Sequence, residues 1–355
     1  RQSMKKHEKI YFKRFATLSG KSDLSYLKLF DALDRMPRYD EKKLEAKLRN
    51  ESFLPRLSYV KNYLKNSILD ALYSYGVDKM VDETELTATR LRKMLEQTYI
   101  LEAKGAKEEA LKLAQKVRKG ASAHENFAIW VQAKQREGRL AYHVKRGESG
   151  YEKEEYELRA ELIEITKKLS RLCEYQFTMH QVSMMAKDRL KAGGERSDSE
   201  LRKLLQHVMP ENAQPDSVRV EYARLNVVSN LYWLLGEYKN AAHHLHENLE
   251  LVEANIELFP FGLLMTEYHN LIFTCGAAGE FELGNKLVER FERVPCKNAS
   301  EENSKIIHRL SSVIPFFVKS AQYEHAEAMD ALALKSLAKP TFPQAVKMNL
   351  YAPFV

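Results

Sequence analysis

Glycine and proline are scarce in this chain, with 14 and 10 occurrences among 355 residues. A β-sandwich or β-barrel needs many tight turns and therefore many such residues. Between the few breaks, apolar residues recur at intervals of three and four, the spacing of a helix buried on one face. The composition therefore indicates an all-α protein.

Cysteine is also rare. Cys173, Cys275 and Cys296 lie far apart in the sequence. An odd number of widely spaced cysteines disfavours a disulfide framework and is typical of a reducing compartment. Cys173 and Cys275 fall within apolar helical patterns, so we expect both to be core residues rather than nucleophiles.

Long apolar segments are missing as well. No apolar run approaches 18 residues, and no secretory signal is recognisable. We therefore expect a cytoplasmic protein with no membrane partner. A chain of 355 residues exceeds the usual size of a single core, so we expect either several domains or an extended helical solenoid.

A short sequence pattern occurs twice in the second half of the chain. Leu235–Ala241 reads LGEYKNA, and Ala278–Gly284 reads AGEFELG, with their shared glycines 43 positions apart. Helical apolar spacing precedes and follows each copy. An aromatic residue stands two positions after the glycine, and a small residue stands five positions after it. This pattern predicts a repeated pair of antiparallel helices, with close contact at the small residue.

Two further copies match in part. Gly105 is followed five positions later by Ala110, with Lys107 in the aromatic position. Ala321–Ala326 keeps the aromatic and small residues but lacks the glycine. Gly150 and the pair Gly193–Gly194 lie near the turns expected between Gly105 and Gly236. We count four repeats and infer two more, which gives about six helix pairs. The alternative is an irregular helical bundle in which the glycine spacing arose by chance.

These offsets of glycine, aromatic residue and alanine resemble the tetratricopeptide repeat. Leu225, Ser229 and Tyr232 match the family's first-helix positions, whereas Ile272 stands where a small residue belongs. The period exceeds the family's usual 34 residues by about nine. The resemblance implies a right-handed α-α superhelix over residues 81–355, with a concave groove lined by the first helix of each pair.

The chain as a whole resembles a group of uncharacterised bacterial proteins with tetratricopeptide-like repeats. The matching segments before the repeats are Tyr26–Ala32, Tyr39–Leu44 and Lys61–Leu64. This resemblance implies no activity. Ala345–Tyr351 is expected to begin another helix, but no polar helix then covers the last apolar face. We expect a shortened form of a longer protein, or an end that pairs with another copy.

If tetratricopeptide geometry holds, counting back from each turn gives the residues that face the groove. They are Arg92, Tyr99, Asn226, Asn230, Trp233, His269, Phe273 and His308. Asparagine and histidine could hydrogen-bond an extended peptide, and the aromatic residues could anchor it. Trp233 has an equally good interpretation as a core residue between repeats. The predicted function is a non-catalytic protein- or peptide-binding scaffold.

The remaining helices follow from apolar spacing and from helix-breaking residues. The expected helices are Met4–Leu18, Ser25–Met36, Glu41–Arg49, Leu57–Tyr75, Thr84–Lys104, Ala106–Arg118, Ser122–Val144, Glu154–Cys173, Glu200–Val208, Ser217–Leu235, Glu302–Lys319 and Glu324–Leu337. We expect Glu154–Cys173 either to run on or to bend into a further helical stretch, Gln176–Leu190. In Leu57–Tyr75 the expected core stripe is Val60, Leu64, Ile68, Leu69 and Leu72.

Positive charge is concentrated in residues 1–80, which hold 18 Lys and Arg against 10 Asp and Glu. We expect these residues to form a separate helical domain. Its helix after Pro55 presents Lys61, Asn62, Lys65 and Asn66, a layout found in helix-turn-helix readers of DNA. The alternative function is therefore a regulator that contacts nucleic acid through this domain. The simpler interpretation is a helical cap with a solvated face.

No motif for catalysis is recognisable. The sequence has no nucleophile motif and no pair of carboxylates that requires a catalytic explanation, so we expect a non-enzyme without a cofactor. The densest set of metal-ligand residues is His243, His244, His246 and Glu247. Two or three of them could contact one ion, but the order of a zincin helix and a nearby cysteine are both missing. We therefore predict no metal site, and we leave the oligomeric state open.

Overall fold

The computed structural model describes residues 4–18, 25–76, 83–192, 198–209 and 217–337. All regular structure within these ranges is helical, which confirms the all-α prediction. The chain divides into two compact units, Arg1–Thr89 and Arg90–Val355, so the boundary lies nine residues beyond residue 80. Gly193–Gly194 and Ala345–Tyr351, expected as a turn and a helix, lie outside the described residues.

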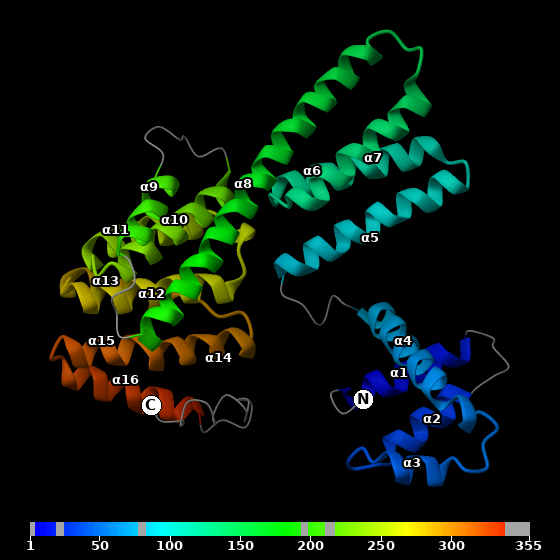
Figure 1. Ribbon diagram of the computed structural model, residues 1–355, viewed down its shortest axis with the longest axis horizontal. Helices are drawn as coiled ribbons and strands as arrows, with labels where there is room; N and C mark the ends of the chain where they lie inside the picture. Colours follow the sequence, from blue (N-terminus) through cyan, green and yellow to red (C-terminus); the bar gives the residue numbers. More distant parts are fainter. Residues whose placement is uncertain (1–3, 19–24, 77–82, 193–197, 210–216, 338–355) are drawn as a thin grey trace. The chain divides into compact units, whose positions relative to one another are not determined.

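The smaller unit is built around one long helix. Its helices are α1 (Lys6–Leu18), α2 (Ser25–Asp34), α3 (Glu41–Lys47) and α4 (Leu57–Gly76). Both α1 and α2 pack against α4 (Figure 1). Phe12 and Phe30 are fully buried, with ring centroids 4.7 Å apart. The Asp40 side chain accepts a hydrogen bond from the Lys43 N–H at 3.1 Å, which caps the N-terminus of α3.

The core stripe of α4 differs from the expected one. Val60 and Leu64 are buried as expected, but Leu69 is 54% exposed. The buried stripe continues through Ala71 instead. Leu69 lies about 140° around the helix from Leu64, away from the packed side, so its apolar character misled the prediction.

Five further helices follow, and the larger unit begins within the first of them. They are α5 (Glu83–Ala103), α6 (Lys107–Ala123), α7 (Phe127–Lys145), α8 (Tyr151–Ala192) and α9 (Asp198–Val208). Helix α6 packs against α7, and α7 packs against α8 (Figure 1). Helix α8 is unbroken, as expected from the continuation beyond Cys173.

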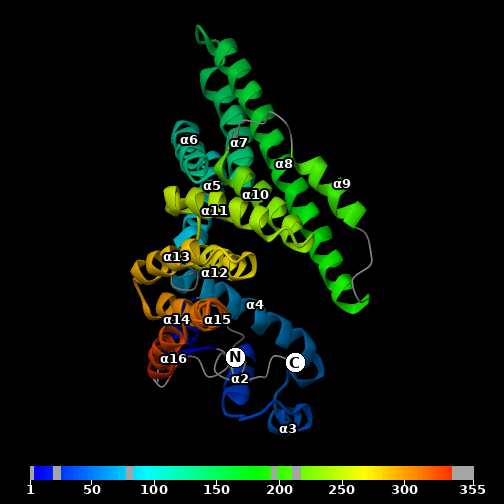
Figure 2. The same cartoon turned by 90° about the vertical axis from the view of Figure 1, so that its left-hand side faces the viewer.

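The rest of this unit is a stack of helix pairs. Its helices are α10 (Val218–Leu234), α11 (Tyr238–Ala254), α12 (Phe261–Ala278), α13 (Phe281–Arg293), α14 (Ala299–His308), α15 (Ile314–Lys319) and α16 (Tyr323–Leu337). Figures 1 and 2 show α10 with α11, α12 with α13, and α14–α16 as successive layers. A π-helical segment, Arg309–Val313, joins α14 to α15. Pro315 cannot donate a backbone hydrogen bond, which explains the irregularity just before it.

Five turns in this unit share one backbone geometry. Each has a residue with positive φ: Gly105 (83°), Glu125 (46°), Gly236 (77°), Gly279 (74°) and Ala321 (58°). In each, the N–H of the following residue donates to the carbonyl five positions earlier, over 2.8–3.0 Å. The next helix begins two residues after the turn residue. This is a Schellman closure, which satisfies the last carbonyls of the first helix while it reverses the chain.

The turn at Glu125 corrects the expected helix Ser122–Val144. Helix α6 runs on to Ala123, and α7 begins only at Phe127. No glycine marks this turn. The Glu125 carboxylate instead accepts hydrogen bonds from Ser217 Oγ (2.9 Å) and from the N–H groups of Val218 (3.1 Å) and Arg219 (2.7 Å). These N–H groups open α10 and have no partner within the helix, so the carboxylate caps it from a distant part of the chain.

Five residues after four of the turns, the expected small residue is present. These residues are Ala110, Ala241, Gly284 and Ala326, and all are buried. A Cβ atom added at Gly284 would overlap the ring of Phe316 from α15. Glycine is therefore required at this position by an aromatic residue of the following layer, not by the turn itself.

Two substitutions of Glu125 should distinguish its two effects on stability, the helix cap that its carboxylate provides and the strain of its positive φ. Glu125→Ala removes the carboxylate and keeps a Cβ at positive φ, so we expect a loss of about 1–2 kcal/mol in the free energy of unfolding. Glu125→Gly also loses the cap but relieves the strain, so its loss should be smaller. Urea denaturation of both variants measures the difference. Equal stability of wild type and Glu125→Ala would contradict the cap.

Gly284→Ala should destabilise the larger unit by about 1–3 kcal/mol, because the new methyl group overlaps the Phe316 ring. Phe316→Leu makes room in the same place. The double variant should therefore lose less than the sum of the two single losses, which a double-mutant cycle in urea measures. Strict additivity would mean that Phe316 is not the limiting contact.

Candidate functional site

The residues expected to face the groove lie on four helices. Arg92 and Tyr99 lie on α5, and Asn226, Asn230 and Trp233 lie on α10. His269 and Phe273 lie on α12, and His308 ends α14. The structure brings His269 and His308 together across two layers, with ring centroids 5.4 Å apart. It places Arg92 and Tyr99 on a separate groove with residues of α7.

The groove between α5 and α7 has a volume of about 560 Å³. Besides Arg92 and Tyr99, its lining residues are Leu95, Glu96, Gln132, Gln135, Arg136 and Arg139. Tyr99 is 52% exposed, and the centre of the Arg136 guanidinium lies 3.9 Å from the centroid of its ring. This groove therefore offers one exposed aromatic ring backed by a cation.

Arg136 is held rigidly by α5. It is 3% exposed, and it donates to Thr98 Oγ1 (2.8 Å) and to the Thr98 carbonyl (2.9 Å). Its Nη1 forms an ion pair with Glu102 at 2.6 Å. The interaction with the Arg136 side chain is the main reason why the pKa of Glu102 is lowered. Glu102 also pairs with Arg139 at 3.2 Å, so one carboxylate balances part of the groove's positive charge.

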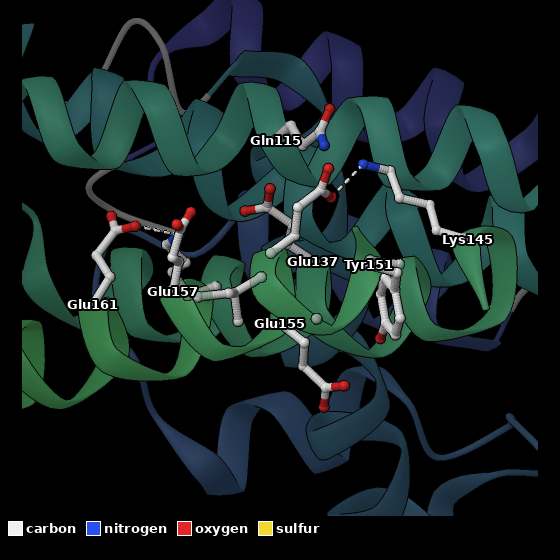
Figure 3. Close-up of a pocket in the computed structure, with 12 residues that line it drawn as sticks. Gln115, Glu137, Lys145, Tyr151, Glu155, Glu157 and Glu161 are labelled. Atoms are coloured by element: carbon white, nitrogen blue, oxygen red, sulfur yellow. Dashed lines mark hydrogen bonds and ion pairs between the residues drawn. The ribbon is translucent and has the colours of Figure 1, made fainter. Parts of the chain in front are cut away.

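A smaller pocket of about 210 Å³ lies between α6, α7 and α8 (Figure 3). Figure 3 shows the acidic side chains of Glu157 and Glu161 on its α8 side. Three ion pairs cross between the helices around it. The pairs are Arg118 with Glu137 at 2.8 Å, Lys145 with Glu154 at 2.6 Å, and Lys134 with Glu161. These contacts join the three helices, and the sequence pattern did not predict them.

Helix α12 presents only uncharged side chains to solvent. Its accessible residues are Phe261, Gly262, Leu263, Thr266, His269, Asn270, Phe273, Ala277 and Ala278. Its one charged residue, Glu267, is 1% exposed. Charged residues make up 30% of the chain, so a whole helix without an accessible charge is a distinct local feature.

The first helices of the neighbouring helix pairs also expose uncharged side chains over long stretches. On α10, no charged residue follows Arg224, and the accessible residues include Asn226, Asn230 and Trp233. From Asn303 to Val318, across α14 and α15, every accessible residue is uncharged. We call the accessible residues Asn226–Leu234, those of α12 and those of 303–318 the uncharged face. The second helices differ, since α11 and α13 expose Lys, Glu and Arg side chains.

The two histidines of the uncharged face are half-buried and neutral at pH 7. Burial lowers the pKa of His269. Burial and then the neighbouring His269 lower the pKa of His308 to about 4. Ser311 Oγ lies 3.2 Å from His269 Nδ1, whereas His308 Nδ1 has no hydrogen-bond partner within the described part of the chain. The pair offers neutral hydrogen-bonding groups beside Phe273, whose ring stacks on His269.

Three large apolar side chains project from the uncharged face. Trp233, Phe273 and Val318 are 39%, 45% and 50% exposed. Trp233 packs its edge against Tyr238, with ring centroids 6.0 Å apart, and leaves the rest of its surface accessible. Asn230 donates to the carbonyl and side-chain oxygens of Asn226 at 2.8 and 2.9 Å, so these two amides hold each other in place.

The residues expected to contact nucleic acid lie on α4. Lys61 donates to Tyr39 Oη at 3.0 Å and pairs with Glu41 at 2.5 Å. These hydrogen bonds, first to Glu41 and then to Tyr39, raise the pKa of Lys61. Asn62, Lys65 and Asn66 are exposed. Lys61 is therefore already paired, and the exposed part of this set carries a single positive charge.

A buried carboxyl group lies beneath the uncharged face. Glu267 accepts hydrogen bonds from Tyr222 Oη (2.9 Å) and Asn248 Nδ2 (3.3 Å), which join α10, α11 and α12. Burial raises the pKa of Glu267 to about 7. Asn248 Oδ1 has no partner among the described residues, so it could accept a hydrogen bond from the protonated acid after an amide flip. Sequence reasoning missed this group, although Glu267 is the one charged residue of α12.

Of the two cysteines expected in the core, only one is buried. Cys275 is buried, as expected, and burial raises the pKa of its thiol to about 12. Cys173 is exposed, so the expectation that it belongs to the core is wrong. Helix α8 is long and packed on one side only in this stretch, and apolar neighbours therefore did not imply burial.

The histidine-rich part of α11 brings together three of the four residues that stood out in the sequence. Glu247 lies between His243 and His244, at 3.6 and 2.8 Å from their nitrogens. His246 instead faces Glu250 at 3.8 Å. The structure thus groups the adjacent histidines with Glu247 and pairs His246 with a different carboxylate.

Comparisons with protein-family models, curated proteins and solved structures gave no match to this chain. Within the described ranges, no helix has both the length and the apolar character needed to cross a membrane.

Glu267 should make stability depend on pH. Its native pKa lies above that of an unfolded glutamate, so the native state binds an extra proton between pH 4.3 and 7, and stability should fall as pH rises through this interval. Glu267→Gln should remove this slope and raise stability at pH 8 by on the order of 2 kcal/mol. Urea denaturation at pH 5, 6.5 and 8 measures it.

His308 contributes to the pH dependence of stability with the opposite sign. Because His308 is present in both wild type and Glu267→Gln, its contribution cancels when the two pH profiles are compared. Exposed Glu257 provides a matched control, because Glu257→Gln should leave the slope intact. Parallel pH profiles for wild type and Glu267→Gln would show that Glu267 ionises normally.

Proposed function

We propose that this chain is a non-catalytic scaffold that binds an extended, uncharged peptide segment of a partner protein along the uncharged face. The observation that carries the proposal is the absence of accessible charge on α12 and on 303–318. Buried contact with an ionic side chain requires that the ion lose its hydration. A face free of such groups favours contact with a peptide backbone and apolar side chains.

The repeated turn supports a superhelical arrangement of α10–α16. Gly236, Gly279 and Ala321 are 43 and 42 positions apart and share the same left-handed geometry. Ten positions before them stand Asn226, His269 and Ser311, all accessible and uncharged. We propose that these first helices line the concave side of a right-handed superhelix, as the resemblance to tetratricopeptide repeats implies.

The face combines the two kinds of group that peptide recognition needs. Trp233, Phe273 and Val318 provide apolar area, which contributes most where it becomes buried. The amides and imidazoles between them could pair with the N–H and carbonyl groups of an extended chain. Because His269 and His308 are neutral at pH 7, the face should bind similarly across the physiological pH range.

A peptide array probed with the full chain tests the proposal. We expect enrichment of uncharged sequences that contain aromatic or branched apolar residues, and little salt dependence. Phe273→Ala and Asn230→Ala should each weaken the selected peptides about tenfold, which corresponds to about 1.4 kcal/mol. Tyr156→Ala, on the 76% exposed tyrosine of α8, is the control and should have no effect.

Two results would contradict the scaffold. The first is selection of peptides whose binding survives Phe273→Ala and Asn230→Ala together. The second is retention of nucleic acid that falls steeply with salt and is lost with Lys65→Ala, since phosphate contacts release counterions. The second result would place the function in the smaller unit.

A further inference from the structure

Two histidines and one glutamate of α11 gather their ligand atoms in one place. One nitrogen from each of His243 and His244 and one oxygen of Glu247 lie within 4.8 Å of one another. The carboxylate lies between the rings: His244 Nδ1 is 2.8 Å from Oε2, and His243 Nε2 is 3.6 Å from Oε1. These residues lie outside the uncharged face and have no part in the proposed peptide binding.

Packing with α10 fixes the orientation of one of these ligands. The side chain of His244 is only 15% exposed, and its ring stacks on Tyr232 with an interplanar angle of 10° and centroids 5.4 Å apart. His243 is 70% exposed and can rotate. The site thus has one oriented imidazole, one carboxylate bonded to it, and one mobile imidazole that can close on an ion.

Nearby cations have partners of their own. Arg224 of α10, whose charge acts on Glu247, is bound to Glu221 through two hydrogen bonds of 2.6 and 2.9 Å. Arg290 of α13 pairs with Glu253 and lies 3.8 Å from Glu250. Both guanidinium groups thus pair with carboxylates other than Glu247, which leaves the Glu247 carboxylate available to another cation.

We propose that His243, His244 and Glu247 bind a divalent transition-metal ion of the zinc class. Two imidazole nitrogens and one carboxylate oxygen match the ligands of Zn²⁺, Ni²⁺ and Cu²⁺, whereas Ca²⁺ and Mg²⁺ prefer oxygen alone. The ion takes the place of the direct contact between His244 Nδ1 and the Glu247 carboxylate. Water completes its coordination, which leaves a position open to a further ligand.

The test is a Zn²⁺ titration of the full chain against a chromophoric chelator, with Co²⁺ absorption as a report on the ligands. We expect one ion per chain. His243→Ala and Glu247→Gln should each weaken binding about tenfold or more, since even partners of metal ligands contribute that much. His243 is exposed, so its removal leaves the fold intact. His246→Ala is the matched control and should change affinity by less than about twofold.

Three outcomes would overturn the site. Unchanged affinity in His243→Ala and Glu247→Gln would show that these residues are not ligands. An equal loss in His246→Ala would show diffuse binding to surface histidines. Loss of zinc binding in a Cys173→Ser/Cys296→Ser variant, with His243→Ala unaffected, would place the ion at the thiols.

Discussion

The left-handed turn that ends the first helix of a pair is the constraint on which the larger unit depends. Its bond from one N–H to the carbonyl five residues earlier forces the next helix to begin two residues on. The chain then returns close to the helix it left, and five residues after four of the five turns stands a buried Ala or Gly. With the second helix fixed in this way, one face of each first helix remains free of intrapair contact.

Sequence reasoning found those turns that glycine or regular spacing marks. Gly236 and Gly279 were identified by residue type, and Ala321 by its distance from them. The turn at Glu125 was missed because its unfavourable backbone angle is offset by hydrogen bonds to residues 92–94 positions away. No local pattern carries information of that kind, so the boundary between α6 and α7 was misplaced.

In the candidate site, too, the sequence predicted some features and missed those that depend on distant residues. Counting back from the turns correctly gave accessible positions on the first helices. The sequence alone also shows that α12 contains almost no charged residue. The sequence did not indicate that α7 contributes to the groove. Its start was misplaced, and the contact of Arg136 with Tyr99 was therefore not recognised. Burial of Glu267 and exposure of Cys173 depend on neighbours from other helices, which periodicity along one helix does not determine.

The Glu125 carboxylate also has a topological meaning. The chain leaves this point at the start of α7 and returns to it at Ser217, after the 42-residue helix α8. The two ends of the segment between Glu125 and Ser217 are thus joined by the hydrogen bonds of one carboxylate. Helices α8 and α9 within this segment also pack against α10, so the junction at Glu125 closes a segment that is itself folded rather than a flexible loop.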